Sequence, residues 1–284
     1  MIDLHCHILP GIDDGARDLT VALDMARAIV ADGVTVVACT PHILPGLYHN
    51  SGPQILAAVA ALQAAVADNG IPLQLVAGAD NHIVQNFVGG LKSGHLLGLA
   101  NSRYVLVEPP HHVMPVRIED LFFDITVAGY VPILTHPERL TWIKNNYAVI
   151  ERLVQGGVWM QITAASLTGA FGRSARYWAE RMLDDGLVHI LATDAHDNER
   201  RPPNLAEGQR LAEQRVGARE AMHLVATRPR GVLDNALASS LPPPPARDAL
   251  AAMAGIERHT SGEHGRRAPT SGGGFASKLR RLFE

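Results

Sequence analysis

Two histidines separated by one residue open the chain, and a pair of aspartates follows them. With a period of two along residues 2–8, His5 and His7 share one face of an extended strand, and Ile2, Leu4, Cys6 and Ile8 share the other. The turn Asp13-Asp14-Gly15 can then bring a carboxylate over the two rings. Imidazole and carboxylate groups are ligands for divalent metal ions, although half-exposed strand histidines would give the same pattern.

Other candidate ligands stand at or just past the ends of expected strands. We expect these strands at residues 34–39, 73–78, 104–107, 131–135, 158–162 and 188–193. The candidate metal ligands are His5, His7, Asp14, His42, Asp80, Glu108, His136, Asp194 and His196. Because the carboxyl ends of parallel strands meet at one rim, these side chains are expected to converge. They are too many for one zinc ion, and they predict two or three divalent ions, with Mn²⁺, Fe²⁺ or Zn²⁺ all plausible.

Several of these motifs also have a structural interpretation. His42 could be an exposed residue of a rigid Thr-Pro-His loop, Glu108 a solvated strand end, and Asp194 a helix N-cap. Five other histidines show no such register with strand ends. We expect His189 in the interior, and we expect surface or loop positions for His82, His95, His111 and His112, the last two lining the mouth of the site.

Two arginines stand beside candidate ligands. Arg139 follows His136 by three residues, and Arg201 lies in the loop after His196, with Arg200 able to take its place. A guanidinium group matches the geometry of a phosphoryl group, whereas the alternative role is a surface ion pair. We therefore predict phosphoester hydrolysis, with Arg139, Arg201 and His42 as catalytic residues and the two arginines binding the phosphate. The chain has no Cys-x₅-Arg loop, so a cysteine-based phosphatase is not expected.

Helical and extended patterns alternate along the chain. The expected helices cover residues 19–32, 55–68, 118–128, 147–154, 174–183, 205–216 and 219–226. This alternation predicts right-handed βαβ units and a largely parallel sheet. About seven such units fit a closed or nearly closed barrel better than an open sheet.

Composition limits the classes of protein that the chain can belong to. Its 284 residues are 47% hydrophobic and 19% charged, which is typical of a globular protein. A net charge of −3 gives no reason to expect a nucleic-acid partner. The start lacks the pattern of a signal peptide and no stretch is apolar enough to span a bilayer, so we expect a cytoplasmic protein. Cys6 and Cys39 are expected as packed thiols, with a disulfide as the alternative.

The composition changes near residue 238. We assign residues 1–237 to the barrel and residues 238–284 to a tail rich in Pro, Gly, Ser and Arg. From residue 247 to 284 the tail carries seven basic and four acidic residues. Its last ten residues, 275–284, form a short basic amphipathic segment that could dock on a partner or peripherally on an anionic membrane, or could simply be a solvated tail.

These motifs, in this order, resemble the PHP (polymerase and histidinol phosphatase) superfamily. The resemblance is strongest to its bacterial branch of manganese-dependent protein-tyrosine phosphatases of capsular and exopolysaccharide systems. The matching segments are residues 1–8, Asp13-Asp14-Gly15, Thr40-Pro-His42, Gly78-Ala79-Asp80, residues 102–108, His136-Pro-Glu-Arg139, Asp194-Ala-His196 and Arg201-Pro-Pro203.

The resemblance implies a distorted (β/α)₇ barrel with a trinuclear centre, most simply of Mn²⁺, on the nine candidate ligands, and phosphate-binding arginines at 139 and 201. The implied substrate is an autophosphorylated tyrosine kinase of polysaccharide biosynthesis and export. One departure concerns Asp80, because the family usually carries a glutamate there that bridges metals. Two other functions remain open: a phosphatase for histidinol phosphate or a sugar or nucleotide phosphate, and a non-catalytic metal-binding regulatory protein.

Overall fold

The computed structural model describes residues 1–245, and all of their paired strands run parallel. One sheet has the order β1-β2-β4, and the other has the order β3-β5-β6-β7-β8-β9. The strands are β1 (Ile2–Cys6), β2 (Val36–Cys39), β3 (His42–Ile43), β4 (Gln74–Ala77), β5 (Asp80–His82), β6 (Tyr104–Glu108), β7 (Val131–Thr135), β8 (Trp159–Thr163) and β9 (Ile190–Ala192). The expected parallel α/β fold is confirmed.

The two sheets are nearly continuous with each other. β2 pairs with β4 up to Cys39 and Ala77, and three residues later His42 pairs with Asp80 in the second sheet. At the other edge, a single parallel bridge joins Cys6 to Ala195 beyond β9. Within residues 1–245 the strands therefore form two sheets rather than one closed barrel, and the closed seven-stranded form stays a prediction.

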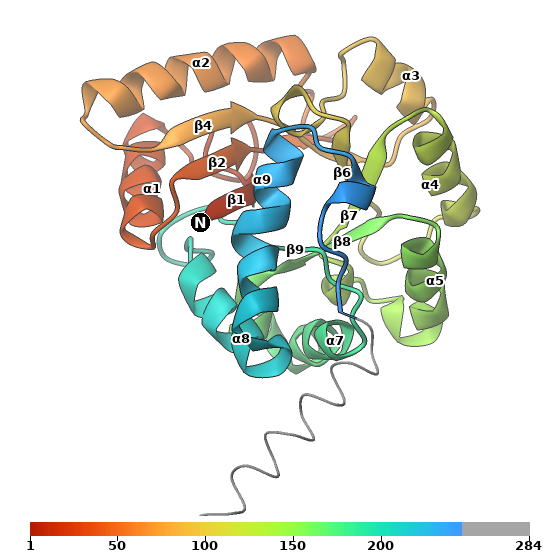
Figure 1. Ribbon diagram of the computed structural model, residues 1–284. Coiled ribbons are helices and arrows are strands. Elements are labelled where there is room, and N and C mark those ends of the chain that lie inside the picture. Colours follow the sequence, from red (N-terminus) through yellow and green to blue (C-terminus); the bar gives the residue numbers. More distant parts are fainter. Residues whose placement is uncertain (246–284) are drawn as a thin grey trace, which may run out of the picture.

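Helices lie around the strands (Figure 1). The longer ones are α1 (Leu19–Ala31), α2 (Gly52–Asp68), α4 (Ile118–Val127), α5 (Ile143–Gln155), α7 (Gly172–Asp184) and α8 (Leu205–Met222). The short ones are α3 (Phe87–Lys92), α6 (Ala164–Thr168) and α9 (Arg228–Leu233), and a π-helical turn, His223–Thr227, joins α8 to α9. No helix within residues 1–245 is long and apolar enough to cross a bilayer.

The buried apolar side chains form two clusters. The larger one packs strands against the outer helices and includes Met25, Phe122 and Met182. The smaller one draws on strands of both sheets, with Leu4 from β1 and Ile133 from β7, and Val232 of α9 covers it. Because both sheets contribute to the smaller cluster, they enclose a common interior.

The strict alternation expected for residues 2–8 is wrong in detail. Ile2 and Leu4 belong to the smaller cluster, whereas Cys6 and Ile8 belong to the larger one. The physical reason is an irregularity in the pairing of β1 with β2 between Asp3 and Cys6. The extra residue at such an irregularity moves the following side chains to the other face, so the face of each residue depends on the pairing.

The two cysteines and the first tail residues lie against the domain. Cys6 and Cys39 are register neighbours on β1 and β2, and both are buried free thiols, so the alternative of a disulfide is wrong. Leu241 packs on the smaller cluster, and the Pro242 carbonyl oxygen accepts a hydrogen bond of 2.7 Å from Arg228 Nε. The first residues that we assigned to the tail thus contact the domain. The amphipathic segment 275–284 lies outside the described residues.

Candidate metal centre

All nine candidate ligands lie close together, in β1, β3, β5 and β6 or in loops that follow strands. Each of them belongs to at least one group of three or four residues whose potential ligand atoms lie within 4.8 Å of one another. These groups also contain His82 and His111, which we did not count as ligands. Strands and the loops that follow them therefore bring eleven imidazole and carboxylate side chains together.

The backbone reaches this arrangement through close approach and left-handed residues. A Cβ at Gly15 would lie 2.0 Å from the His7 carbonyl oxygen, so only glycine lets the aspartate turn fold over β1. His136 and Asp194 have φ of 35° and 50°, which is unusual for residues with a side chain. Both amides are held by neighbouring strands, since Asp194 N donates to His5 O at 2.8 Å and His136 N donates to Gln161 O at 2.8 Å.

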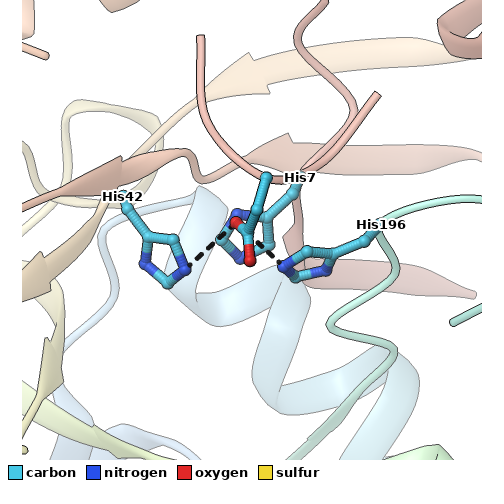
Figure 2. Close-up of side chains that lie close together, drawn as sticks. His7, His42 and His196 are labelled. Atoms are coloured by element: carbon cyan, nitrogen blue, oxygen red, sulfur yellow. Dashed lines mark ion pairs between the residues drawn. The ribbon is translucent and has the colours of Figure 1, made fainter. Parts of the chain in front are cut away.

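One group surrounds the carboxylate of Asp14. Its Oδ1 lies 3.5 Å from His42 Nε2 and 3.4 Å from His196 Nε2. Figure 2 shows the rings of His7, His42 and His196 gathered around this carboxylate. His7 is oriented from behind, because its Nδ1 lies 2.7 Å from Asp13 Oδ2. A carboxylate on the outer nitrogen fixes a histidine so that its other nitrogen faces the site.

A second group joins β1 to the ends of β7 and β9. Asp194 Oδ1 lies 3.4 Å from His5 Nε2 and 3.3 Å from His7 Nε2. The two imidazole nitrogens are themselves 3.2 Å apart. His5 is oriented by Gln161, whose Oε1 lies 2.8 Å from His5 Nδ1. His5 in β1 and His7 just after it thus direct their Nε2 atoms toward one position.

The third region is built around Glu108, the last residue of β6. Its Oε1 lies 3.4 Å from His136 Nε2 and 3.1 Å from His111 Nε2. Its Oε2 lies 3.3 Å from His42 Nδ1 and 2.5 Å from His82 Nε2. Four imidazoles therefore face one carboxylate.

Sequence analysis misplaced one of these residues and placed the others correctly. His82 is a half-buried residue of β5, so the prediction of a surface or loop position is wrong. The signal was available, because Asp80 and His82 are two residues apart and share a face of the strand. His111 lies in the loop after β6, and His112 beside it is exposed. His95 is exposed and His189 is buried, as predicted.

Carboxylates hold protons on two of the imidazoles. Burial alone would lower the pKa of His5, but the charges of Asp194 and Asp80 outweigh it and raise that pKa to about 9. Burial likewise opposes the shift at His42, where contact with Glu108 and the charge of Asp80 raise the pKa to about 9. A divalent ion that binds His5 or His42 must therefore displace a proton.

Two other imidazoles are held neutral. Burial and the charge of His7 lower the pKa of His196 to about 4. Burial and the charge of Arg139 hold the pKa of His136 well below its usual value. Neutral imidazole is the form that binds a metal ion, so these two rings are ready to act as ligands.

The donor set fits a cluster of divalent ions. Donor atoms bound at about 2.0–2.2 Å to one ion lie roughly 3.0–3.5 Å apart, which is the spacing of the nitrogen and oxygen atoms in these groups. Both carboxylate oxygens of Asp80 are buried without a hydrogen-bond donor, and so are His136 Nδ1 and His196 Nε2. Buried polar atoms without partners are costly, and bound ions would satisfy those that face the site.

Two arginines approach the same centre from one side. Arg139 and Arg201 both donate to Asp194 Oδ2, whereas Asp194 Oδ1 faces the histidines. The Arg139 guanidinium lies 4.3 Å from the centroid of the Phe171 ring, and the Arg201 guanidinium lies 5.7 Å from it. Arg200 is exposed and lines a separate cleft with residues of α1, so it does not take the position of Arg201.

A cavity of about 390 Å³ adjoins Arg139. Its apolar wall includes Phe171 and Trp178, and its polar wall includes Lys144. Arg139 lies between this cavity and Asp194, so a group in the cavity would be next to the metal centre. An aromatic ring has room there, with stacking partners on the wall.

The chain is similar to proteins of one bacterial family. Residues 1–234 match the family described as capsular polysaccharide synthesis, CpsB/CapC. Tyrosine-protein phosphatase YwqE of Bacillus subtilis (strain 168) is 34% identical over 247 residues, which are 87% of this chain and 97% of YwqE. Tyrosine-protein phosphatase CpsB of Streptococcus pneumoniae is 26% identical over 241 residues, which are 82% of this chain and 98% of CpsB.

The solved structures agree. One chain from the crystal structures of YwqE from Bacillus subtilis and CpsB from Streptococcus pneumoniae, described as unique metal-dependent tyrosine phosphatases, matches with a TM-score of 0.80 and 34% identity. The match covers 84% of this chain and 96% of that one. The phosphotriesterase from Mycobacterium tuberculosis matches with a TM-score of 0.51 and 11% identity, over 82% of this chain and 94% of that one, and shares the fold alone.

Proposed function

The chain belongs to the CpsB/CapC family of capsular polysaccharide synthesis, and on that premise we propose that it is a metal-dependent protein-tyrosine phosphatase. The observation that carries this proposal is the position of Asp194. One of its oxygens faces the histidines and the other accepts from two arginines. The two arginines, which can bind a phosphate, thus lie next to the histidines, which can bind metal ions. Phosphoester hydrolysis requires this arrangement.

The ligands that we propose are His5, His7, Asp14, His42, Asp80, Glu108, His136, Asp194 and His196. Two or three divalent ions on these residues, most simply Mn²⁺, would supply a water of lowered pKa and neutralise phosphoryl charge. His42 has a place in catalysis because its two nitrogens face different groups, Nε2 toward Asp14 and Nδ1 toward Glu108. The ring of His42 thereby contacts two carboxylates of the proposed centre, Asp14 and Glu108.

The arginines bind the phosphoryl group of the substrate. Arg139 is held on the Phe171 ring, so its guanidinium reaches the site in a restricted orientation. Arg201 donates to the same oxygen of Asp194 from the loop before α8. Two guanidinium groups can hold the oxygens of the phosphoryl group while negative charge spreads over them.

We further infer that the two sheets form a distorted (β/α)₇ barrel over residues 1–237. Support comes from the short steps between β2 and β3 and between β4 and β5, and from the bridge between Cys6 and Ala195. When each broken strand is treated as one, the strands follow each other in chain order around the common interior.

The substrate is a phosphotyrosine on a protein, and we propose a tyrosine kinase of polysaccharide biosynthesis as its source. The cavity beside Arg139 supports an aromatic substrate, because Phe171 and Trp178 line it. The family description supports the biological setting, since it refers to capsular polysaccharide synthesis.

Turnover of phosphotyrosine peptides, measured beside a panel of phosphorylated metabolites on protein of known metal content, tests this function. We expect kcat/KM to be highest for the peptides. A preference above about a hundredfold for histidinol phosphate or a sugar or nucleotide phosphate, roughly 2.7 kcal/mol in the transition state, would instead assign the site to a small molecule. No turnover of any phosphoester with metals bound would favour a regulatory protein.

A further inference from the structure

Glu108 is surrounded by more imidazoles than the resemblance assigns to it. His136 and His42 belong to the ligand set implied by the family, whereas His82 and His111 do not. His82 comes from β5 and His111 from the loop after β6, and each has a nitrogen close to a different oxygen of Glu108. Glu108 is therefore shared by two groups, one with His42 and His82 and one with His111 and His136.

Both groups at Glu108 bring three potential ligand atoms together. His82 Nε2 lies 2.5 Å from Glu108 Oε2 and 3.2 Å from His42 Nδ1, and His111 Nε2 lies 3.1 Å from Glu108 Oε1. Within each group the potential ligand atoms lie within 4.8 Å of one another. Each group can therefore hold one divalent ion.

Glu108 lies closer to these imidazoles than Asp80 does. Asp80 Oδ2 lies 4.0 Å from His136 Nε2, farther than the 3.4 Å between that nitrogen and Glu108 Oε1. His82 and His111 likewise contact Glu108. Glu108 is therefore the carboxylate that these imidazoles share.

We propose that His82 and His111 are metal ligands at Glu108. They raise the affinity of this part of the centre for Zn²⁺ or Fe²⁺ relative to its affinity for Mn²⁺. Imidazole favours zinc and iron, whereas carboxylate and water suit manganese and magnesium. The inference rests on the proposed metal centre, but it makes a statement about metal content and selectivity that does not depend on the substrate.

Metal-free full-length protein, exchanged into equal concentrations of Zn²⁺ and Mn²⁺, provides the test. Elemental analysis of the wild-type chain should find zinc enriched over manganese. The double variant H82Q/H111Q should lose that enrichment by about tenfold or more, consistent with the 10–100-fold effects seen when groups around metal sites are changed. X-ray absorption at the zinc edge should count fewer imidazole nitrogens per ion in the variant.

Glutamine makes this test specific. Its amide can still donate a hydrogen bond to Glu108, so a glutamine variant with wild-type metal ratio and nitrogen count would show that the two histidines only orient the carboxylate, and would overturn the proposal. The matched control is H95Q/H112Q, which changes two exposed histidines. Wild-type protein that binds metals but does not hydrolyse phosphotyrosine would contradict the proposed function and leave the ligand assignment standing.

Discussion

Asp194 couples the two halves of the site because its oxygens have different partners. Oδ1 faces the imidazoles of His5 and His7, and Oδ2 accepts from Arg139 and Arg201. Burial would raise the pKa of Asp194, but the nearby charges of His5 and Arg201 outweigh it and hold that pKa well below its usual value. The carboxylate is therefore ionised at neutral pH, the form in which it could bind a metal ion.

Replacing Arg139 separates phosphate binding from metal binding. R139A should retain the metal content of the wild-type chain, because the arginine faces the oxygen of Asp194 that is turned away from the histidines. If the guanidinium stabilises the transition state, R139A should lower kcat/KM on a phosphotyrosine peptide. The loss should correspond to about 2–4 kcal/mol of transition-state stabilisation. Elemental analysis and steady-state kinetics on one preparation measure both effects.

The control is R200A, which removes an exposed arginine one position before Arg201. Its rate should stay close to that of the wild-type chain. An R139A rate equal to the wild-type rate would exclude the proposed role of this guanidinium.

Two candidate ligands that follow strands also have a strained backbone. His136 and Asp194 occupy left-handed backbone conformations, which cost of order 1–3 kcal/mol each. Hydrogen bonds to the carbonyl oxygens of β8 and β1 hold them there. The positions of these two candidate ligands thus depend on the pairing of neighbouring strands, and the proposed metal centre requires the assembled sheets.

The strand β9 also begins beside a buried titratable group. His189 stacks on Trp159, with ring centroids 5.0 Å apart, and burial together with the charge of Arg228 lowers its pKa to about 3. The unfolded chain binds a proton at His189 near pH 6.5, whereas the folded chain does not until about pH 3. Folding is therefore disfavoured progressively as pH falls through this window.

H189F should flatten the pH dependence of stability. Phenylalanine keeps a ring against Trp159 but cannot take up a proton. Between pH 6.5 and pH 4, the wild-type free energy of unfolding should fall faster than that of the variant, by up to about 1.4 kcal/mol per pH unit. Urea unfolding at several pH values measures the difference, and parallel curves for the two proteins would contradict the assignment.

On the scale of the whole molecule, the C-terminal part of the described chain closes one side of the fold. α9 contributes Val232 to the smaller core, and Arg228 is fully buried with an ion pair of 2.7 Å to Glu220. Arg228 also donates to Pro242 O at 2.7 Å and to His189 O at 3.2 Å. The segment after α9 thereby helps to satisfy a buried charge, so part of the expected tail contributes to the fold.

Two truncations test this contribution. A chain that ends at residue 245 keeps these contacts and should unfold at the same urea concentration as the full chain. A chain that ends at residue 238 loses Leu241 and the Pro242 carbonyl, and it should be less stable by roughly 2 kcal/mol, since a hydrogen bond to a charged group contributes about 1.5–3 kcal/mol. Equal stability of the two truncated chains would show that the contacts of residues 239–245 contribute nothing to the fold.

Local pattern was sufficient for the secondary structure and for most of the candidate site. Each expected strand and most of the longer helices lie within a few residues of their expected positions, because apolar periodicity and glycine stops are local properties. The separate helices expected at residues 205–216 and 219–226 are wrong, because α8 continues to Met222 through Gly217. Candidate ligands could be selected for the same reason: in a parallel sheet, a polar residue at a strand end lies at the common rim whatever the rest of the chain does.

Residue order along the chain could not settle which side chains meet. The irregularity in β1 separates Cys6 from Leu4, and it arises from pairing with β2. The contact of His82 with Glu108 depends on the pairing of β5 with β6, and the preference for Arg201 over Arg200 depends on the conformation of the loop after β9. Packing and strand register decide such contacts, whereas the types of side chain at the rim follow from the sequence alone.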